Sequence, residues 1–391
     1  MLRSSTSIVR LARSTSFVPF ARATSVVGLG RSAPARVERA SSAGDTRSSM
    51  RASIARALAV AAALSMGSVL HAQLLSPYAT QVVNYSPGSG GGTFVAANAL
   101  GAPTGGGLSN GSLDVASVGV GGSLTLGFDV TIANGPGVDF TVCENAFVFA
   151  GESFSEVAYV EVSTNGVAFA RLPSRYTGPA TGLPSFTAPF GTYGVLTGTM
   201  PVLANPATNT LDPLDPAWAG GDAFDLADLA NDPLVTSGVV DLAAIHFVRI
   251  VDVPHGTGTD AAGNVIWDNS GATGTADVDA VCVIQHAGTV VAGQPTVDLF
   301  LDAQGYLNLR VEDPDGGADL DGNTIHCSFN GAPIGFRTLA RRLVPNVTPT
   351  ANGYVLRSNG PFVGSGLHGV VTVSVRDVAG HFSADQLSFG G

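Results

Sequence analysis

The chain is divided into short apolar or alternating runs, each ended by Gly, Pro or Asn, and this pattern most constrains its fold. The runs are rich in Val, Ile, Phe and Thr, which favour strands. Only residues 94–100 and 223–230 show a helix-like pattern, and both segments are short. The sequence therefore predicts an all-β protein with strands at Gly122–Val130, Val138–Phe149, Val157–Ser163, Ala244–Val253 and Asp277–Gln285.

The strand pattern pauses at residues 286–296 and then restarts, which indicates a linker between two modules. We expect a jelly-roll-like β-sandwich over residues 73–287, because its many short strands suit two packed sheets. Residues 295–391 have the length of a smaller immunoglobulin-like β-sandwich. Asn-Gly pairs at 165–166 and 330–331 tolerate positive φ and predict hairpin turns.

Residues 1–72 are predicted to be a signal or targeting region, and Met50 is a candidate for the true start. Two arginines follow Met50, an apolar run covers Ala57–Val69, and a small-residue cleavage site precedes Gln73. The run is too short to span a bilayer. We therefore expect export to the extracellular space or cell surface without membrane insertion. An Arg-rich organelle transit peptide is the alternative.

The charge balance bears on the kind of partner. The 391-residue chain has a formal net charge of −11 and contains no lysine. Loss of the Arg-rich first segment would make it still more acidic. This argues against nucleic acid and anionic membranes as partners, and it fits multivalent cations or neutral ligands such as an extracellular glycan or surface matrix.

Sequence motifs of common enzyme classes lack the structural context that they need. Gly107–Gly111 matches a nucleophile elbow but lies between Gly-rich loops, and Gly364–Gly369 matches a dinucleotide fingerprint but precedes a strand. No two cysteines have CxxC spacing, so zinc and redox motifs are absent from the sequence. We expect Cys143, Cys282 and Cys327 to be buried apolar side chains.

Acidic residues at strand ends are the strongest candidate site. In Asp277–Gln285, alternation would place Val278, Ala280 and Cys282 on the core face, with Asp277 and Asp279 together on the other. Paired carboxylates repel unless a cation lies between them. We expect a structural calcium ion held by these candidate ligands: Glu144, Asp252, Asp277 and Asp279. The alternative is that both aspartates are merely solvated.

A second acidic stretch, Glu312–Asn323, looks like a calcium loop. The EF-hand order fails, because Gly317 stands where Asp or Asn is needed and no flanking helices are predicted. We expect an acidic turn at the end of a sandwich, with or without an ion.

Several sequence blocks together resemble a family of uncharacterised bacterial exported cell-surface proteins with a jelly-roll-like module. The blocks lie between Tyr78 and Gln285 and include "GGSLTLGFD", "DFTVCENAF" and "DVDAV". The family usually has Phe where this chain has Cys143 and Ala276. The resemblance implies an exported jelly-roll module and brings no established activity.

Trp218 and Trp267 lie in Gly- and Asp-rich loops and are candidate ligand platforms, although each could instead plug its loop onto the core. Our leading expectation is a non-catalytic binding or surface-architecture protein, with a glycan as the candidate ligand. The runner-up is a secreted polysaccharide hydrolase with paired carboxylates. A structural spacer without a small ligand is a third hypothesis.

Overall fold

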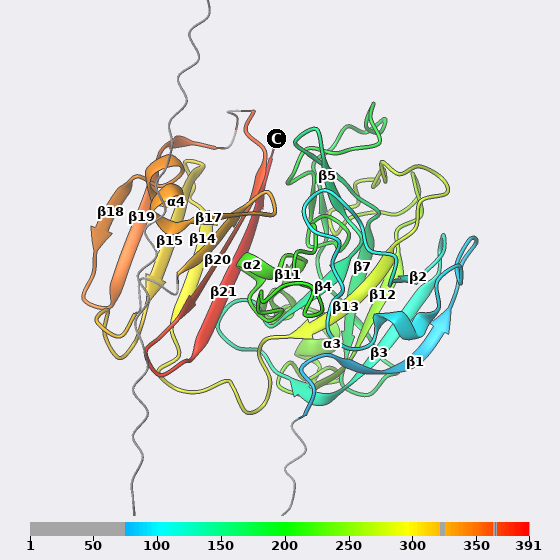
Figure 1. The fold of residues 1–391 in the computed structure, drawn as a ribbon, viewed down its shortest axis with the longest axis horizontal. Helices are drawn as coiled ribbons and strands as arrows, with labels where there is room; N and C mark the ends of the chain where they lie inside the picture. Colours follow the sequence, from blue (N-terminus) through cyan, green and yellow to red (C-terminus); the bar gives the residue numbers. More distant parts are fainter. Residues whose placement is uncertain (1–74, 321–324, 363, 365, 391) are drawn as a thin grey trace, which may run out of the picture. The chain divides into compact units, whose positions relative to one another are not determined.

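The computed structural model describes residues 75–320, 325–362, 364 and 366–390, and these described residues form one compact unit (Figure 1). The predicted targeting region, with its alternative start at Met50, lies outside the described residues. Antiparallel strands dominate and the helices are short, so the prediction of an all-β sandwich fold is confirmed. Within the described ranges, no helix is long and apolar enough to cross a membrane.

Two antiparallel sheets form the first sandwich, and the chain passes back and forth between them, as in a jelly roll. The five-stranded sheet has the order β1 (Ala79–Ser86), β3 (Ser123–Ile132), β12 (Ile245–Asp252), β7 (Ala158–Ser163) and β8 (Ala170–Arg171). The four-stranded sheet has the order β11 (Asp222–Phe224), β4 (Phe140–Glu144), β13 (Asp277–Val283) and β2 (Ala116–Ser117).

Short elements connect these strands. One hairpin pairs β5 (Phe147–Phe149) with β6 (Glu152–Phe154), and β9 (Arg175–Tyr176) pairs with β10 (Tyr193–Gly194). The helical turns are η1 (Ala96–Ala99), α2 (Pro216–Ala219), η2 (Leu226–Leu229) and α3 (Pro233–Thr236). The two helix-like segments of the sequence thus contain single 3₁₀ turns, η1 and η2.

The core of the first sandwich lies between its two sheets. Leu124 and Leu126 of β3 are fully buried there, and Phe140 of β4 stacks on Phe224 of β11 with ring centroids 5.4 Å apart. Burial of one such side chain stabilises the fold by roughly 1.5–3 kcal/mol. This packing fixes the strand ends that carry the candidate site.

The second sandwich has an immunoglobulin-like arrangement of two four-stranded sheets. One sheet has the order β14 (Thr296–Leu301), β15 (Tyr306–Glu312), β19 (Gly353–Pro361) and β18 (Asn346–Pro349). The other has the order β17 (Ala332–Gly335), β16 (His326–Phe329), β20 (Gly369–Arg376) and β21 (Phe382–Phe389). These match the ABED and CFG sheets, with β17 as an additional strand. Helix α4 (Phe336–Arg342) follows β17.

Both predicted Asn-Gly turns form hairpins. The turn at 165–166 joins β7 to β8, and Gly166 has φ of 72°. The turn at 330–331 joins β16 to β17, with φ of 52° at Asn330 and 74° at Gly331. The three cysteines are free and buried, as expected.

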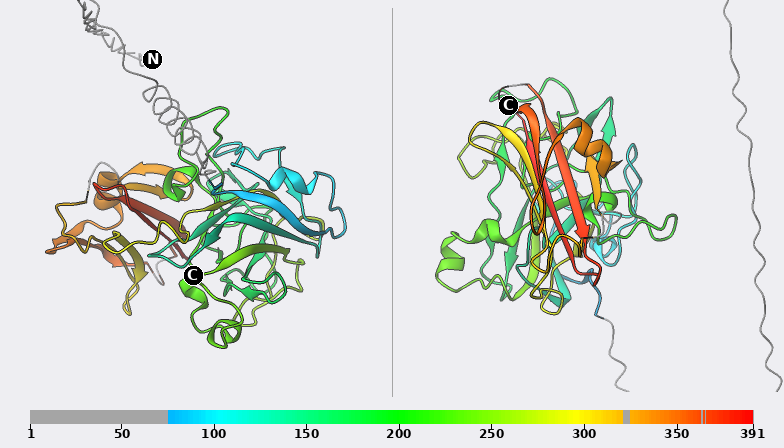
Figure 2. Two further views of the ribbon diagram at one scale, coloured as in Figure 1. Left: turned by 90° about the horizontal axis from the view of Figure 1, so that it is seen from below. Right: turned by 90° about the vertical axis from the view of Figure 1, so that its left-hand side faces the viewer.

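Direct contacts join the two sandwiches. The sheet with β20 and β21 is the nearer to the first sandwich (Figure 1), and Figure 2 gives two further views. Gly137 forms a parallel bridge with Ala384 of β21. Asp215, which caps α2, accepts a hydrogen bond from Ser374 of β20 at 2.6 Å and contacts the ring nitrogen of His326.

The predicted linker is also in contact with both sandwiches. His286 bridges to Ile132 of β3, and Gln294 donates from its side chain to the carbonyl of Phe382 at 2.5 Å.

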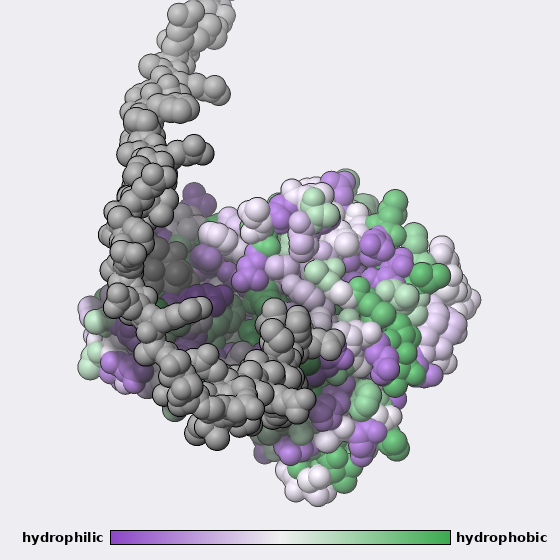
Figure 3. Space-filling model, turned by 60° about the horizontal axis from the view of Figure 1, so that its bottom comes forward, coloured by the Kyte–Doolittle hydropathy of each residue, from purple (hydrophilic) through white to green (hydrophobic). Residues whose placement is uncertain are grey.

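On the face presented in Figure 3, hydrophilic and hydrophobic residues are interspersed.

Candidate functional site

Strand β13 contains a β-bulge at the predicted pair of aspartates. Val278 pairs with Glu144 and Ala280 pairs with Cys143, so the register shifts at Asp279. A bulge adds one residue and reverses the alternation of side chains beyond it. The two aspartates therefore do not simply share one face of a regular strand.

The bulge overturns part of the expected core. Val278 packs between the two sheets, whereas Ala280 and Cys282 belong to a separate cluster with Cys143 and Val202. The expectation that Val278, Ala280 and Cys282 share the core face is wrong beyond the bulge. Regular alternation cannot reveal an extra residue whose position is set by the neighbouring strand.

The carboxylate of Asp279 is held by hydrogen bonds from Thr104. Its two carboxylate oxygens accept from the backbone N–H of Thr104 at 3.0 and 2.9 Å, and the Thr104 hydroxyl donates at 2.9 Å. Burial raises the pKa of Asp279 to about 6, although these hydrogen bonds act in the opposite direction. The carboxylate thus ties residues near 104 to the end of the four-stranded sheet.

Five other carboxylates form what we call the rim acid cluster: Glu144, Glu156, Asp252, Asp268 and Asp277. They come from the end of β4, the residues after β6, the end of β12, the loop after β12 and the start of β13. Their charges act on one another. Glu156 and Asp277 both raise the pKa of Glu144, and Asp252 raises that of Asp268.

Backbone N–H groups supply most of the hydrogen bonds to this cluster. Glu144 Oε1 accepts from the N–H of Asp277 at 2.9 Å, and Asp252 accepts from that of Gly121 at 2.8 Å. Glu156 accepts from the N–H of Thr275 at 3.2 Å. These bonds fix the acids in place and leave some oxygens unsatisfied.

Two buried oxygens of the cluster have no hydrogen-bond partner. They are Oε2 of Glu144, a residue that is 1% exposed, and Oδ1 of Asp277. An unpaired buried carboxylate oxygen is costly unless a proton or a cation satisfies it. At each of these two atoms a proton or a cation would relieve the cost of burial.

Positive charge is scarce around the cluster. The ion pairs of the described chain involve Glu161, Asp212, Asp215, Asp302 and Asp377, and none of the rim acids. His255 lowers the pKa of Asp268, which offsets part of the effect of burial. Among the residues that the structure describes, no Arg side chain forms an ion pair with the cluster.

Burial is the main cause of raised pKa values in the rim acid cluster. It holds the pKa of Glu144 well above its ordinary value and raises that of Glu156 to about 7 and that of Asp268 to about 6. The pKa values of Asp252 and Asp277 are raised for the same reason. Near neutral pH the cluster must hold protons, bind a cation or lose stability.

Three of the four predicted metal ligands belong to this cluster: Glu144, Asp252 and Asp277. Asp279 is engaged by Thr104 instead. Three side-chain ligand atoms lie within 4.8 Å of one another at only one place in the described ranges, and that place is Asp313, Asp319 and Asp377. An ion at the rim would accordingly use few side-chain oxygens and complete its shell with water.

A hairpin with exposed phenylalanines rises directly from the rim. Its strands β5 and β6 lie between Glu144 and Glu156 in the sequence. Phe147 and Phe154 stack across the hairpin with centroids 4.8 Å apart. The ring centroid of Phe186, from a neighbouring loop, lies 5.3 Å from that of Phe149 and 6.2 Å from that of Phe154. We call Phe147, Phe149, Phe154 and Phe186 the phenylalanine patch.

The outer rings of this patch are accessible. Phe149 is 53% exposed and Phe186 is 50% exposed, although both are large apolar side chains. Scattered exposed apolar residues are ordinary, whereas clustered ones mark contact surfaces. The patch is therefore a candidate binding platform.

Trp218, one predicted platform, lies in α2 beside the second sandwich. Its ring stacks on His326 with centroids 3.6 Å apart and planes at 10°. It lines a cavity of about 330 Å³ together with Asp212, Asp215 and Arg376. The stacked imidazole covers one face of the indole, so at most the other face is open.

Trp267, the second predicted platform, packs onto a core. It contacts a buried cluster that includes Tyr159, Tyr193 and Ile266, and the ring of His255 meets it edge-on. Its indole nitrogen is buried without a hydrogen-bond partner. This packing corresponds to the alternative in which the tryptophan plugs its loop.

Comparison of the chain with models of known protein families and with curated proteins finds no match. The resemblance to exported cell-surface proteins therefore stays a prediction from the quoted sequence blocks.

Sequence reasoning missed Glu156, Asp268 and the phenylalanine patch. The pattern Phe-x-Phe at 147–149 followed by Phe154 could have signalled an aromatic face on a hairpin. Glu156 and Asp268 carry no such signal, because they reach the rim from loops whose course depends on tertiary packing.

Proposed function

We propose that this chain is an exported, non-catalytic binding or surface-architecture protein in which a calcium ion at the rim acid cluster fixes a glycan-binding hairpin. The observation that carries the proposal is the position of the cluster. Glu144 and Glu156 flank the hairpin that presents Phe147, Phe149 and Phe154.

Calcium suits the rim because the available ligands are carboxylate oxygens in irregular loops. Oε2 of Glu144 and Oδ1 of Asp277 are the unpaired oxygens that would bind it. The ion would turn mutual repulsion of the acids into attraction and hold the base of the hairpin. The contribution of the ion is structural, and the chain performs no reaction through it.

The phenylalanine patch supplies the contact surface. Sugar rings have apolar C–H faces that pack on aromatic rings, and exposed aromatic clusters are favourable contact sites. The carboxylate of Glu152 beside the patch accepts from Thr187 at 2.5 Å and adds a polar edge. An extracellular glycan is therefore the favoured ligand.

The hydrolase alternative has less support. It requires two carboxyl groups that face an open groove. Glu144 is 1% exposed, and the space that it lines together with Asp279 is too small to hold a water molecule. We give Glu144 a structural role for this reason.

A binding screen tests the proposal. We expect the full chain to bind at least one member of a panel of insoluble and arrayed polysaccharides. Replacing both Phe149→Ala and Phe186→Ala should weaken that binding about tenfold or more, which corresponds to about 1.4 kcal/mol. Both side chains are half-exposed, so the fold should persist.

Val167→Ala is a matched control, because Val167 is 86% exposed and lies outside the hairpin. Its binding should equal that of the original chain. Unchanged binding of the double variant would rule out the patch, and no binding to any glycan would favour a spacer. Turnover that depends on Glu144 would favour the hydrolase.

A further inference from the structure

Three aspartates meet at one end of the second sandwich, away from the rim acid cluster. Asp313 directly follows β15, Asp319 lies later in the same connection, and Asp377 directly follows β20. The backbone joins the two turns, because Leu320 bridges to Asp377 and the N–H of Val378 donates to the carbonyl of Asp319 at 3.0 Å.

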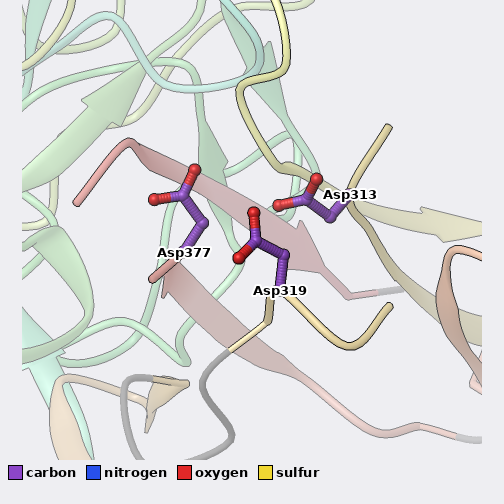
Figure 4. Close-up of side chains that lie close together, drawn as sticks. All are labelled: Asp313, Asp319 and Asp377. Carbon is purple, nitrogen blue, oxygen red and sulfur yellow. The ribbon is translucent and has the colours of Figure 1, made fainter. Parts of the chain in front are cut away.

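The three carboxylates converge on one point. One oxygen of each lies within 4.8 Å of the others, and Figure 4 shows Asp319 between Asp313 and Asp377. Two oxygens bound to one calcium ion at about 2.4 Å can be at most about 4.8 Å apart. The observed spacing is therefore compatible with a shared ion.

Asp313 provides an independent indication of a ligand. The residue is 0% exposed, and its Oδ1 accepts from the N–H of Asp315 at 2.8 Å. Its Oδ2 has no hydrogen-bond partner, although it is buried beside two further carboxylates. Burial raises the pKa of Asp313, and the charges of Asp319 and Asp377 raise it further.

The nearby basic side chains do not satisfy this oxygen. His381 binds the carboxylate of Asp377 twice. The ring Nδ1 of His381 lies 2.6 Å from Oδ2, and the backbone N–H of His381 donates to Oδ1 at 2.7 Å. The guanidinium of Arg376 donates to the carbonyl of Gly380 at 3.0 Å and lies over the ring of Phe382. Asp315 adds a fourth acid nearby.

We propose that Asp313, Asp319 and Asp377 bind a calcium ion that links the β15–β16 connection to the β20–β21 turn. An all-oxygen set in irregular turns suits calcium, which accepts six to eight oxygen ligands in flexible geometry. Zinc prefers nitrogen and sulfur, and magnesium demands a near-ideal octahedron. Water molecules complete the shell. This site is independent of the rim site.

Calcium titration of the chelator-treated full chain, followed by calorimetry, tests this inference. Asp313→Asn should remove one equivalent of bound calcium or weaken its binding at least tenfold. Asp319→Ala should have the same effect, and because Asp319 is only half-buried this variant should fold readily. The control is Asp298→Asn, which removes an exposed carboxylate from β14 of the same sandwich and should leave binding unchanged.

The two sites can be separated by variants. Asp277→Asn acts on the rim and should leave the calcium ion of the second sandwich bound. Calcium binding that is unchanged in both Asp313→Asn and Asp319→Ala would overturn the inference, whether or not the rim binds an ion. In chelator, Asp313→Asn should instead raise the melting temperature, because it removes an uncompensated buried charge.

Discussion

In the presence of a chelator, raising the pH from about 5 to about 8 should lower the free energy of unfolding by at least about 3 kcal/mol. Burial raises the pKa of Glu156 from 4.5 to about 7. Asp139 and Asp385, which are also buried, reach about 8 and about 7. Urea denaturation followed by fluorescence at several pH values measures this loss.

The direction follows from proton binding. A carboxyl group whose pKa is higher in the folded state holds more protons there than in the unfolded state. The folded protein therefore loses stability as the pH rises from the pKa that the group has in the unfolded state to the pKa that it has in the folded state. Asp302 has the opposite pH dependence, because its pKa is lower in the folded state and its stabilising effect is lost at acidic pH. Desolvation raises the pKa of Asp302, but hydrogen bonds from the Arg357 side chain and other donors outweigh it and lower the pKa to about 2. Stability in chelator should peak at about pH 4, where the carboxyl groups of the unfolded chain titrate.

Glu156→Gln isolates one contribution to this pH dependence. The variant should reduce the loss between pH 5 and 8 by about 3 kcal/mol, because the amide does not ionise. Val167→Ala, which changes an exposed side chain that does not ionise, is the control and should leave the curve unchanged. A curve that is flat or rises with pH would show that the buried acids are compensated in another way.

Gly137→Ala should lower the free energy of unfolding by about 2–4 kcal/mol. Gly137 has φ of 74°, and a Cβ there would lie 2.1 Å from the carbonyl oxygen of Ala384. The backbone of β21 would have to move, and the bridge between the sandwiches would open. Chemical denaturation of the full chain measures the change.

Gly238→Ala separates the clash from the backbone strain. Gly238 has φ of 75°, and a Cβ there would meet nothing within 4 Å. Its replacement should cost only about 1 kcal/mol, which reflects the strain of positive φ. Equal losses in the two variants would mean that the contact between Gly137 and Ala384 contributes little.

The all-β fold was predictable because local signals agreed with one another. Alternating apolar residues, β-branched composition and Asn-Gly turns each favour strands and hairpins, and hairpins formed at 165–166 and 330–331. The pause in the pattern at 286–296 also coincides with the passage between the sandwiches. None of these signals requires knowledge of distant contacts.

The candidate site was only partly predictable. Glu144, Asp252 and Asp277 stand at strand ends, and the sheets bring such ends together. The bulge at Asp279 depends on pairing with β4 and was invisible to alternation. Similarly, Glu312–Asn323 looks like a calcium loop by sequence. The third carboxylate of that site, Asp377, directly follows β20, and its proximity to the loop depends on the tertiary fold.

The most direct test of the account is the melting temperature of the full chain in chelator and in calcium. It is best measured with Asp313→Asn in the background, so that the second sandwich does not contribute. Calcium at a hundred times its Kd should stabilise this chain by about 2.7 kcal/mol, and adding Asp277→Asn should abolish the gain. Identical melting curves in chelator and in calcium before Asp277 is changed would contradict the proposed rim site.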